Sequence, residues 1–84
     1  MEKEQLEKDF AELISDVLPE IEDVDLDAQM EQEYGINSIS IIKLIVAAEH
    51  KFGVEFTDYE LALDNYSTFR NLTDLVYEKI ESLD

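Results

Sequence analysis

The sequence predicts an all-α protein, a small four-helix bundle with three long helices, one short helix and a long acidic loop between helices 1 and 2. Apolar residues recur at spacings of three and four along three long stretches, which is typical of helices packed on a core. The 84 residues include only 2 glycines and 1 proline, too few for a turn-rich β fold, and 45% apolar residues, enough for a core. This length predicts one domain over residues 1–84.

The first long helix is expected over about residues 4–17. Its apolar face comprises Leu6, Phe10, Leu13, Ile14 and Val17. Pro19 should end the helix, because proline lacks an N–H donor and disfavours helical geometry at the preceding residue. Residues 19–37 are acidic and show no sustained period, so we expect a long, partly ordered loop.

The second long helix should begin at Asn37 or Ser38 and end near Phe52, with Gly53 as its stop signal. Its polar stripe is narrow, and nearly all its other positions are apolar. The stripe comprises Ser40, Lys43, Ala47 and His50, and the apolar set comprises Ile39, Ile41, Ile42, Leu44, Ile45, Val46, Ala48 and Phe52. Either the neighbouring helices cover this apolar surface completely, or part of it is left for a partner or a buried ligand.

The remaining helices follow an extended step at residues 54–56. Thr57 and Glu60 form a capping-box pattern that predicts a short helix over residues 59–63. The last long helix is expected to open at Ser67 or Thr68. Its apolar face comprises Phe69, Leu72, Leu75, Val76, Ile80 and Leu83.

The charge balance restricts the classes of partner. Twenty-two acidic residues against six basic ones give a net charge of −16, which excludes nucleic acid and disfavours anionic membranes. Residues 1–35 hold thirteen acidic and two basic residues, so this half should attract proteins with basic patches, unless the acidity only serves solubility. The chain has no cysteine, no apolar run long enough to span a membrane and no signal-peptide pattern, so we expect a cytoplasmic monomer without membrane insertion.

Catalysis and metal binding find little support. His50 is the one histidine, and it lies twelve residues from Ser38 on the same predicted helix, roughly 18 Å along the axis, too far for a dyad. The acidic stretch 23–27 looks like the start of a calcium loop, but registers from Asp23 and from Asp25 both lack the glycine and glutamate that such a loop needs. We therefore expect no catalytic residue and no metal site.

Ser38 has two possible roles at the start of the second helix. Its side chain can cap the helix, or it can be an attachment point. A phosphate ester formed on this hydroxyl would lie against free backbone N–H groups and the positive helix end, which suits an anion.

The region around Ser38 resembles a known family. The segment Tyr34-Gly35-Ile36-Asn37-Ser38-Ile39, followed by Leu44, Glu49, Phe52-Gly53-Val54 and Phe56, is similar to the phosphopantetheine-attachment region of acyl carrier proteins and of their peptidyl and aminoacyl relatives. That region is commonly written L-G-x-D-S-L, then a helix ending in E-x-x-F-G-[IV]. The order of the predicted elements is similar too, so the likeness extends over nearly the whole chain.

The resemblance implies a carrier protein that is not an enzyme. Its cofactor would be 4′-phosphopantetheine, moved from coenzyme A onto Ser38 by a phosphopantetheinyl transferase. The arm would hold acyl or aminoacyl groups as thioesters and deliver them to loading and condensing enzymes of fatty acid, polyketide or nonribosomal peptide biosynthesis. The alternative, from a different class, is an acidic helical adaptor without a prosthetic group. Ser38→Ala should abolish a carrier and spare an adaptor.

Two departures from the family pattern concern partners. Asn37 stands where fatty-acid carriers usually have aspartate, and residues 36–53 carry Lys43 and Lys51 against Glu49, a net charge of +1 where many relatives are acidic. By analogy, Ile39, Val46 and their neighbours would form the apolar part of a docking surface. The departures favour specialised or aminoacyl pathways, or steering by the acidic loop 20–33 instead.

Overall fold

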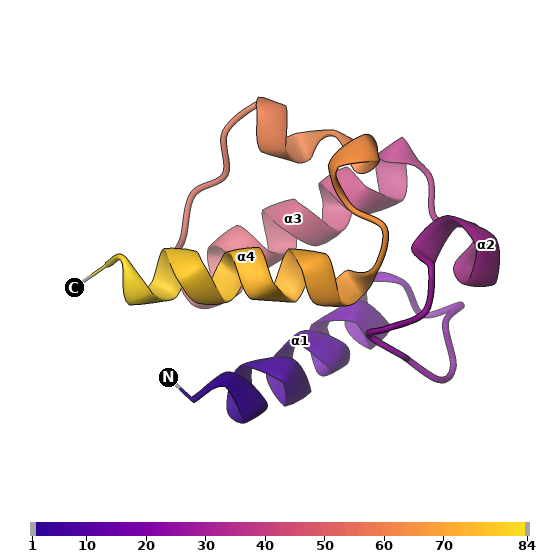
Figure 1. Cartoon of the computed structure of the whole chain (residues 1–84). Coiled ribbons are helices and arrows are strands. Elements are labelled where there is room, and N and C mark those ends of the chain that lie inside the picture. Colours follow the sequence, from indigo (N-terminus) through magenta and orange to yellow (C-terminus); the bar gives the residue numbers. More distant parts are fainter. Residues whose placement is uncertain (1, 84) are drawn as a thin grey trace.

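The computed structural model describes residues 2–83, and in this part of the chain the regular structure is helical (Figure 1). The four α-helices are α1 (Lys3–Val17), α2 (Met30–Tyr34), α3 (Ser38–Phe52) and α4 (Phe69–Glu81). Two single-turn 3₁₀ helices, η1 (Tyr59–Leu61) and η2 (Leu63–Asn65), lie between α3 and α4. The predicted all-α bundle is confirmed.

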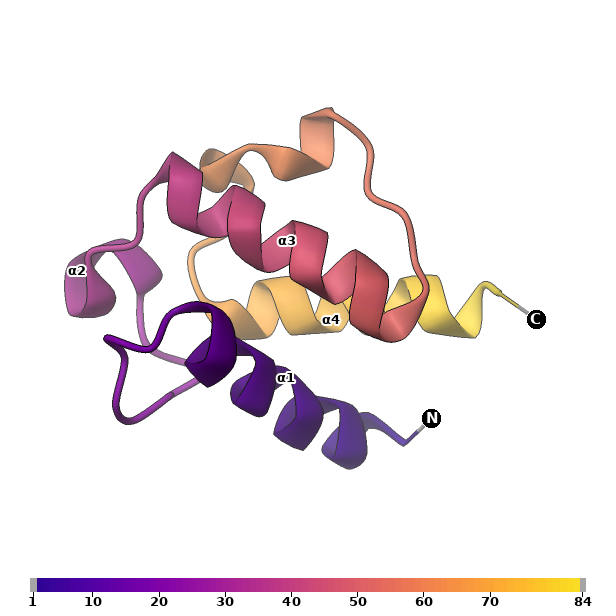
Figure 2. The ribbon, with the colours of Figure 1, turned by 180° about the vertical axis from the view of Figure 1, so that it is seen from behind.

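The three long helices enclose one core. α1 packs against both α3 and α4. Figure 2, which views the molecule from the side opposite to Figure 1, shows α1 below α3. The rings of Phe10 and Phe52 stack with their centroids 6.1 Å apart, joining α1 to the end of α3. The apolar faces predicted for the first and last helices supply the core residues Leu6, Phe10, Leu13, Ile14, Phe69, Leu72 and Val76. Leu83 is the exception: it lies beyond α4 and is 62% exposed.

The helix ends are where the sequence signals place them. α1 stops at Val17, immediately before Leu18 and Pro19. Gly53 adopts the left-handed conformation with φ 67° and caps α3 through its N–H to the Glu49 carbonyl, a conformation that costs glycine little because it has no Cβ. Thr68, one of the two predicted starts, is the N-cap of α4.

The segment predicted as a partly ordered loop is more structured than expected. Residues 30–34 form α2, and Ile21, Met30 and Ile36 are all buried in the core. Five residues are too few to display a helical period, and single anchoring residues separated by acidic ones leave no repeating pattern. Sequence periodicity therefore cannot reveal this helix.

The predicted short helix over residues 59–63 is instead the two turns η1 and η2. Ala62 separates them in an extended conformation with ψ 126°, which breaks the helical hydrogen-bond ladder. The predicted capping pair is nevertheless present: the Thr57 N–H donates to Glu60 Oε1 at 2.8 Å, and the Glu60 N–H donates to Thr57 Oγ1 at 3.3 Å.

Within residues 2–83, none of the helices combines the length and the apolar character needed to cross a membrane.

Candidate functional site

The start of α3 is capped by Asn37. Its Oδ1 accepts hydrogen bonds from the Ser40 N–H at 2.9 Å and from the Ser40 hydroxyl at 3.2 Å. Asn37 itself is extended, with φ −121° and ψ −179°, as an N-cap residue should be. Of the two cap positions left open by the sequence, Asn37 is the correct one, and a capping role for Ser38 is wrong.

Ser38 is therefore left without a capping function. It is the first residue of α3 and is exposed, and none of the side-chain hydrogen bonds found within residues 2–83 involves its hydroxyl. The first hydrogen bond of the helical ladder runs from the Ile41 N–H to the Asn37 carbonyl, so the N–H groups of Ser38 and Ile39 precede that ladder. A solvent-accessible hydroxyl thus lies at the positive end of a fifteen-residue helix.

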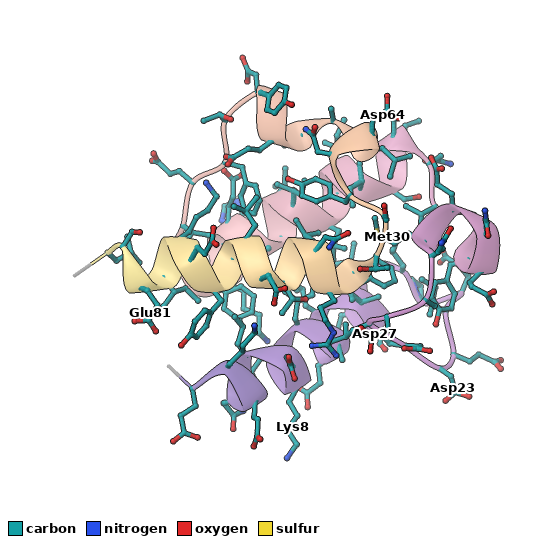
Figure 3. All side chains as sticks on the ribbon, viewed as in Figure 1. Lys8, Asp23, Asp27, Met30, Asp64 and Glu81 are labelled. Carbon is teal, nitrogen blue, oxygen red and sulfur yellow. The ribbon has the colours of Figure 1, made fainter. Side chains whose placement is uncertain are left out.

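The turn that leads into α3 is held from both sides. Gly35 caps α2 in the left-handed conformation with φ 64°, and the Ile36 N–H donates to the Met30 carbonyl. Met30 is fully buried, and its N–H donates to the Ser67 carbonyl just before α4 (Figure 3). The position of Ser38 is consequently tied to the start of α4 through α2, a connection with no signal in the sequence.

A second set of contacts holds the acidic loop against α4. The Arg70 N–H donates to the Leu26 carbonyl at 2.8 Å, and the Arg70 guanidinium pairs with the carboxylates of Glu7 and Asp27. The hydrogen bond from Arg70 lowers the pKa of Asp27 below its ordinary value. The pairing of Asp27 with Arg70 fixes this part of the acidic loop against α4 (Figure 3).

Tyr34 completes this anchoring from α2. Its hydroxyl donates to the Asp23 carbonyl and accepts from the Asp25 N–H, both at 2.9 Å. The centroid of its ring lies 5.7 Å from the ring centroid of Phe69. Two backbone groups of the loop, the Asp23 carbonyl and the Asp25 N–H, are therefore paired with one side chain of α2.

At the far end of α3, the predicted E-x-x-F-G-V motif has a structural role. The Glu49 carboxylate accepts a 2.9 Å hydrogen bond from the Phe56 N–H, which fixes the segment that leaves Gly53. Lys79 lies 4.9 Å from the Phe56 ring centroid and pairs with Glu60 at 2.8 Å. The hydrogen bond from Lys79, aided by the backbone of Thr57, lowers the pKa of Glu60.

Tyr66 lies beside this ion pair. Its hydroxyl donates to the Glu60 carbonyl, and burial, together with the Glu60 charge, raises the pKa of the phenol to about 12. The neutral phenol thus links residue 66 to the backbone of the turn that contains Glu60.

The outward side of α3 carries apolar side chains as well as polar ones. Ile39 is 68% exposed, and Ile42 and Val46 are each 42% exposed. Lys43 and His50 are exposed too, whereas Ser40 and Ala47 are half-buried. The buried side consists of Ile41, Leu44, Ile45 and Ala48. Of the two possibilities raised by the sequence, the one in which the neighbouring helices leave part of the apolar surface uncovered is confirmed.

Comparison with known proteins identifies the family. Residues 8–76 match a family model described as a phosphopantetheine attachment site. An acyl carrier protein from Petrotoga mobilis (strain DSM 10674 / SJ95) is 35% identical over 81 residues, which cover 95% of this chain and 93% of the relative. The chain belongs to the acyl carrier protein family. The crystal structure of an acyl carrier protein from Thermotoga maritima superposes with a TM-score of 0.80 at 29% identity, covering 100% of this chain and 96% of that one.

Phosphopantetheine is the prosthetic group of this family, and the residues at the start of α3 fit it. The group needs a hydroxyl that a second protein can reach, and Ser38 is exposed with its hydroxyl not engaged in capping. A phosphodiester carries a negative charge, and the N–H groups of Ser38 and Ile39 precede the helical ladder beside it. The donor chemistry at this end of α3 therefore suits a phosphate.

Proposed function

We propose that this acyl carrier protein carries its prosthetic arm on Ser38, and that the 1–84 segment acts as one carrier domain. The observation that carries the proposal is that Asn37, and not Ser38, caps the start of α3. Ser38 is exposed, and its hydroxyl is not used in capping. The motif around Ser38 is similar to the family's attachment motif, and it lies within residues 8–76, which the family model matches.

In this proposal a separate transferase attaches the group and supplies the base that activates the Ser38 hydroxyl. The one histidine, His50, lies near the other end of α3. In the reaction, the Ser38 oxygen would bond to the phosphorus atom of coenzyme A that carries the pantetheine group. The pyrophosphate P–O bond would break, the serine proton would pass to the transferase, and adenosine 3′,5′-bisphosphate would leave. When bound, the arm supplies the thiol that this cysteine-free chain lacks.

The cargo in this proposal is an acyl or aminoacyl group held as a thioester and passed between loading and condensing enzymes of fatty acid, polyketide or nonribosomal-peptide type. A mobile arm raises the local concentration of its cargo at each enzyme that the carrier meets. We place the carrier in the cytoplasm, because coenzyme A and such enzymes are found there. We also propose that it acts as a monomer.

The proposal is tested by intact mass after incubation with coenzyme A, magnesium and a broad-specificity transferase. The wild type should gain one phosphopantetheine, and Ser38→Ala should gain none. Ser40→Ala is the matched control, since it removes a hydroxyl two residues away that donates to Asn37. It should still be loaded. An adduct on Ser38→Ala would refute the assignment, and a folded wild type that stays unloaded would favour an adaptor without a prosthetic group.

A further inference from the structure

Arg70, in the first turn of α4, binds both of the segments that precede α2. Its Nε and Nη2 donate to the two carboxylate oxygens of Asp27 in the acidic loop (Figure 3), and its Nη1 donates to Glu7 of α1. Its backbone N–H also donates to the Leu26 carbonyl at 2.8 Å. A guanidinium that pairs with a carboxylate through two parallel bonds fixes its direction as well as its distance. One residue of α4 therefore holds α1 and the loop together.

The acidic loop depends on this residue for a compensating charge. Residues 20–33 hold seven acidic residues and no basic one, and carboxylates gathered in one loop repel each other. Among the ion pairs found within residues 2–83, those that reach this loop all come from Arg70. The pairs of Lys3 and Lys79 join α4 to α1 and to η1 instead. The guanidinium of Arg70 is thus the ionic contact that keeps the loop against the bundle.

The held loop leads directly into α2 and the start of α3. The Met30 N–H donates to the Ser67 carbonyl at 3.0 Å, three positions before Arg70 in the chain. The Ile36 N–H then donates to the Met30 carbonyl at 3.3 Å, two residues before Ser38. The contacts of Arg70 and the two backbone hydrogen bonds therefore form one continuous connection from α4 to the proposed attachment residue.

We propose that Arg70 is a positioning residue for attachment at Ser38, because it holds the acidic loop and α2 so that the start of α3 is presented in one arrangement. The inference rests on the proposed function and adds a residue whose ion-pair partners lie in α1 and the loop, outside α3. Without the guanidinium, a smaller fraction of the molecules has α2 and the start of α3 in this arrangement.

The kinetic consequence falls on KM. An enzyme that binds only one arrangement of its substrate has an apparent dissociation constant raised in inverse proportion to the fraction in that arrangement. Once the carrier is bound, its attachment residue is held as in the wild type, so kcat stays unchanged. A general loss of stability has no such effect at a temperature where the variant is fully folded, because the concentration of folded carrier is then the same.

The experiment measures KM and kcat for the loading of the full chain with coenzyme A, magnesium and a broad-specificity phosphopantetheinyl transferase. The carriers are wild type, Arg70→Met, Arg70→Lys and the control Lys3→Met, at a temperature where circular dichroism shows all of them folded. Lys3→Met is matched to Arg70→Met, since it also removes one positive charge and one ion pair between α1 and α4, with Asp74 at 3.0 Å. Lys3 forms no ion pair with the acidic loop.

A second pair of variants approaches the same contact from the loop. Asp27→Asn removes the carboxylate that binds Arg70, and its side chain is exposed, so the bundle should fold. Glu22→Gln is its control, because Glu22 is an exposed carboxylate of the same loop and takes part in none of the ion pairs found within residues 2–83. Because Asp27 and Arg70 act through one contact, adding Asp27→Asn to Arg70→Met should change KM no further.

KM should rise about three- to tenfold in Arg70→Met, with kcat unchanged. Asp27→Asn should raise KM in the same direction, and Arg70→Lys should raise it less than Arg70→Met, because an ammonium keeps the charge but not the planar fork. Lys3→Met and Glu22→Gln should behave as wild type. Amide exchange at Met30 and Ile36 should accelerate in Arg70→Met, while exchange at Leu44 in the middle of α3 stays as slow as in the wild type.

Several outcomes would overturn the inference while leaving Ser38 as the attachment site. They are an unchanged KM in Arg70→Met, a fall in kcat alone, an equal rise of KM in Lys3→Met, or amide exchange at Met30 and Ile36 that does not respond to Arg70→Met. Failure of the transferase to load the folded wild type is a different result, because it would remove the proposed function and this inference with it.

Discussion

Replacing Asn37 with alanine should loosen the start of α3, where the proposed attachment residue lies. The substitution removes the acceptor of two hydrogen bonds, from the Ser40 N–H and the Ser40 hydroxyl. Loss of an N-cap side chain costs about 1 kcal/mol, within a range of about 0.5–2 kcal/mol. In a domain of this size, 1 kcal/mol corresponds to a fall in Tm of about 4–8 °C.

The assay is thermal unfolding followed by circular dichroism at matched protein concentration and ionic strength. Asn37→Asp is the control, because aspartate keeps the acceptor and adds a negative charge at the positive helix end, worth about 0.3–1 kcal/mol. It should melt at or above the wild-type temperature. Amide exchange at Ser40 should accelerate in Asn37→Ala alone. A Tm unchanged by Asn37→Ala, or an equal loss in Asn37→Asp, would refute the capping role.

Two further predictions concern the segments that hold α3 in place. Arg70→Met removes the hydrogen bond that lowers the pKa of Asp27. In the wild type, the lowered pKa stabilises the folded state at pH values above the ordinary aspartate pKa. This stabilisation is lost as the pH falls through the lowered pKa. The Tm gap between wild type and Arg70→Met should therefore narrow below about pH 4 in a series of melts, and a gap independent of pH would contradict this. Gly53→Ala should cost about 1 kcal/mol in denaturant unfolding, because residue 53 has φ 67° and the new methyl group meets nothing within 4 Å, so the cost is backbone strain. Gly53→Asn should cost less, and equal losses would point to a different cause.

Much of the fold follows from the sequence because the long helices carry strong local signals. α1 and α4 were predictable from apolar faces of three or four turns, and the ends of α1 and α3 from Pro19 and Gly53. The motif around Ser38 predicts this residue as the attachment point, and that assignment stays a proposal. These features depend on residues close together in the chain, and local patterns report such features well.

The parts that escaped prediction depend on distant contacts. α2 is held by the buried Met30 and by a backbone hydrogen bond from Met30 to Ser67, thirty-seven positions away. The ion pairs of Arg70 join three separate segments, and acidic partners are so numerous in this chain that no pattern singles out Glu7 or Asp27. The capping role of Asn37 rather than Ser38 was equally invisible, because both residue types are favoured caps.

The central claim is that the arm is attached to the Ser38 oxygen, and fragmentation mass spectrometry of the loaded protein tests it most directly. A peptide spanning residues 36–43 contains two hydroxyl groups, those of Ser38 and Ser40, so fragment ions that cleave between them locate the added mass. The account predicts that all of the phosphopantetheine is found on Ser38 and none on Ser40. Added mass on Ser40, or on a peptide outside α3, would contradict it.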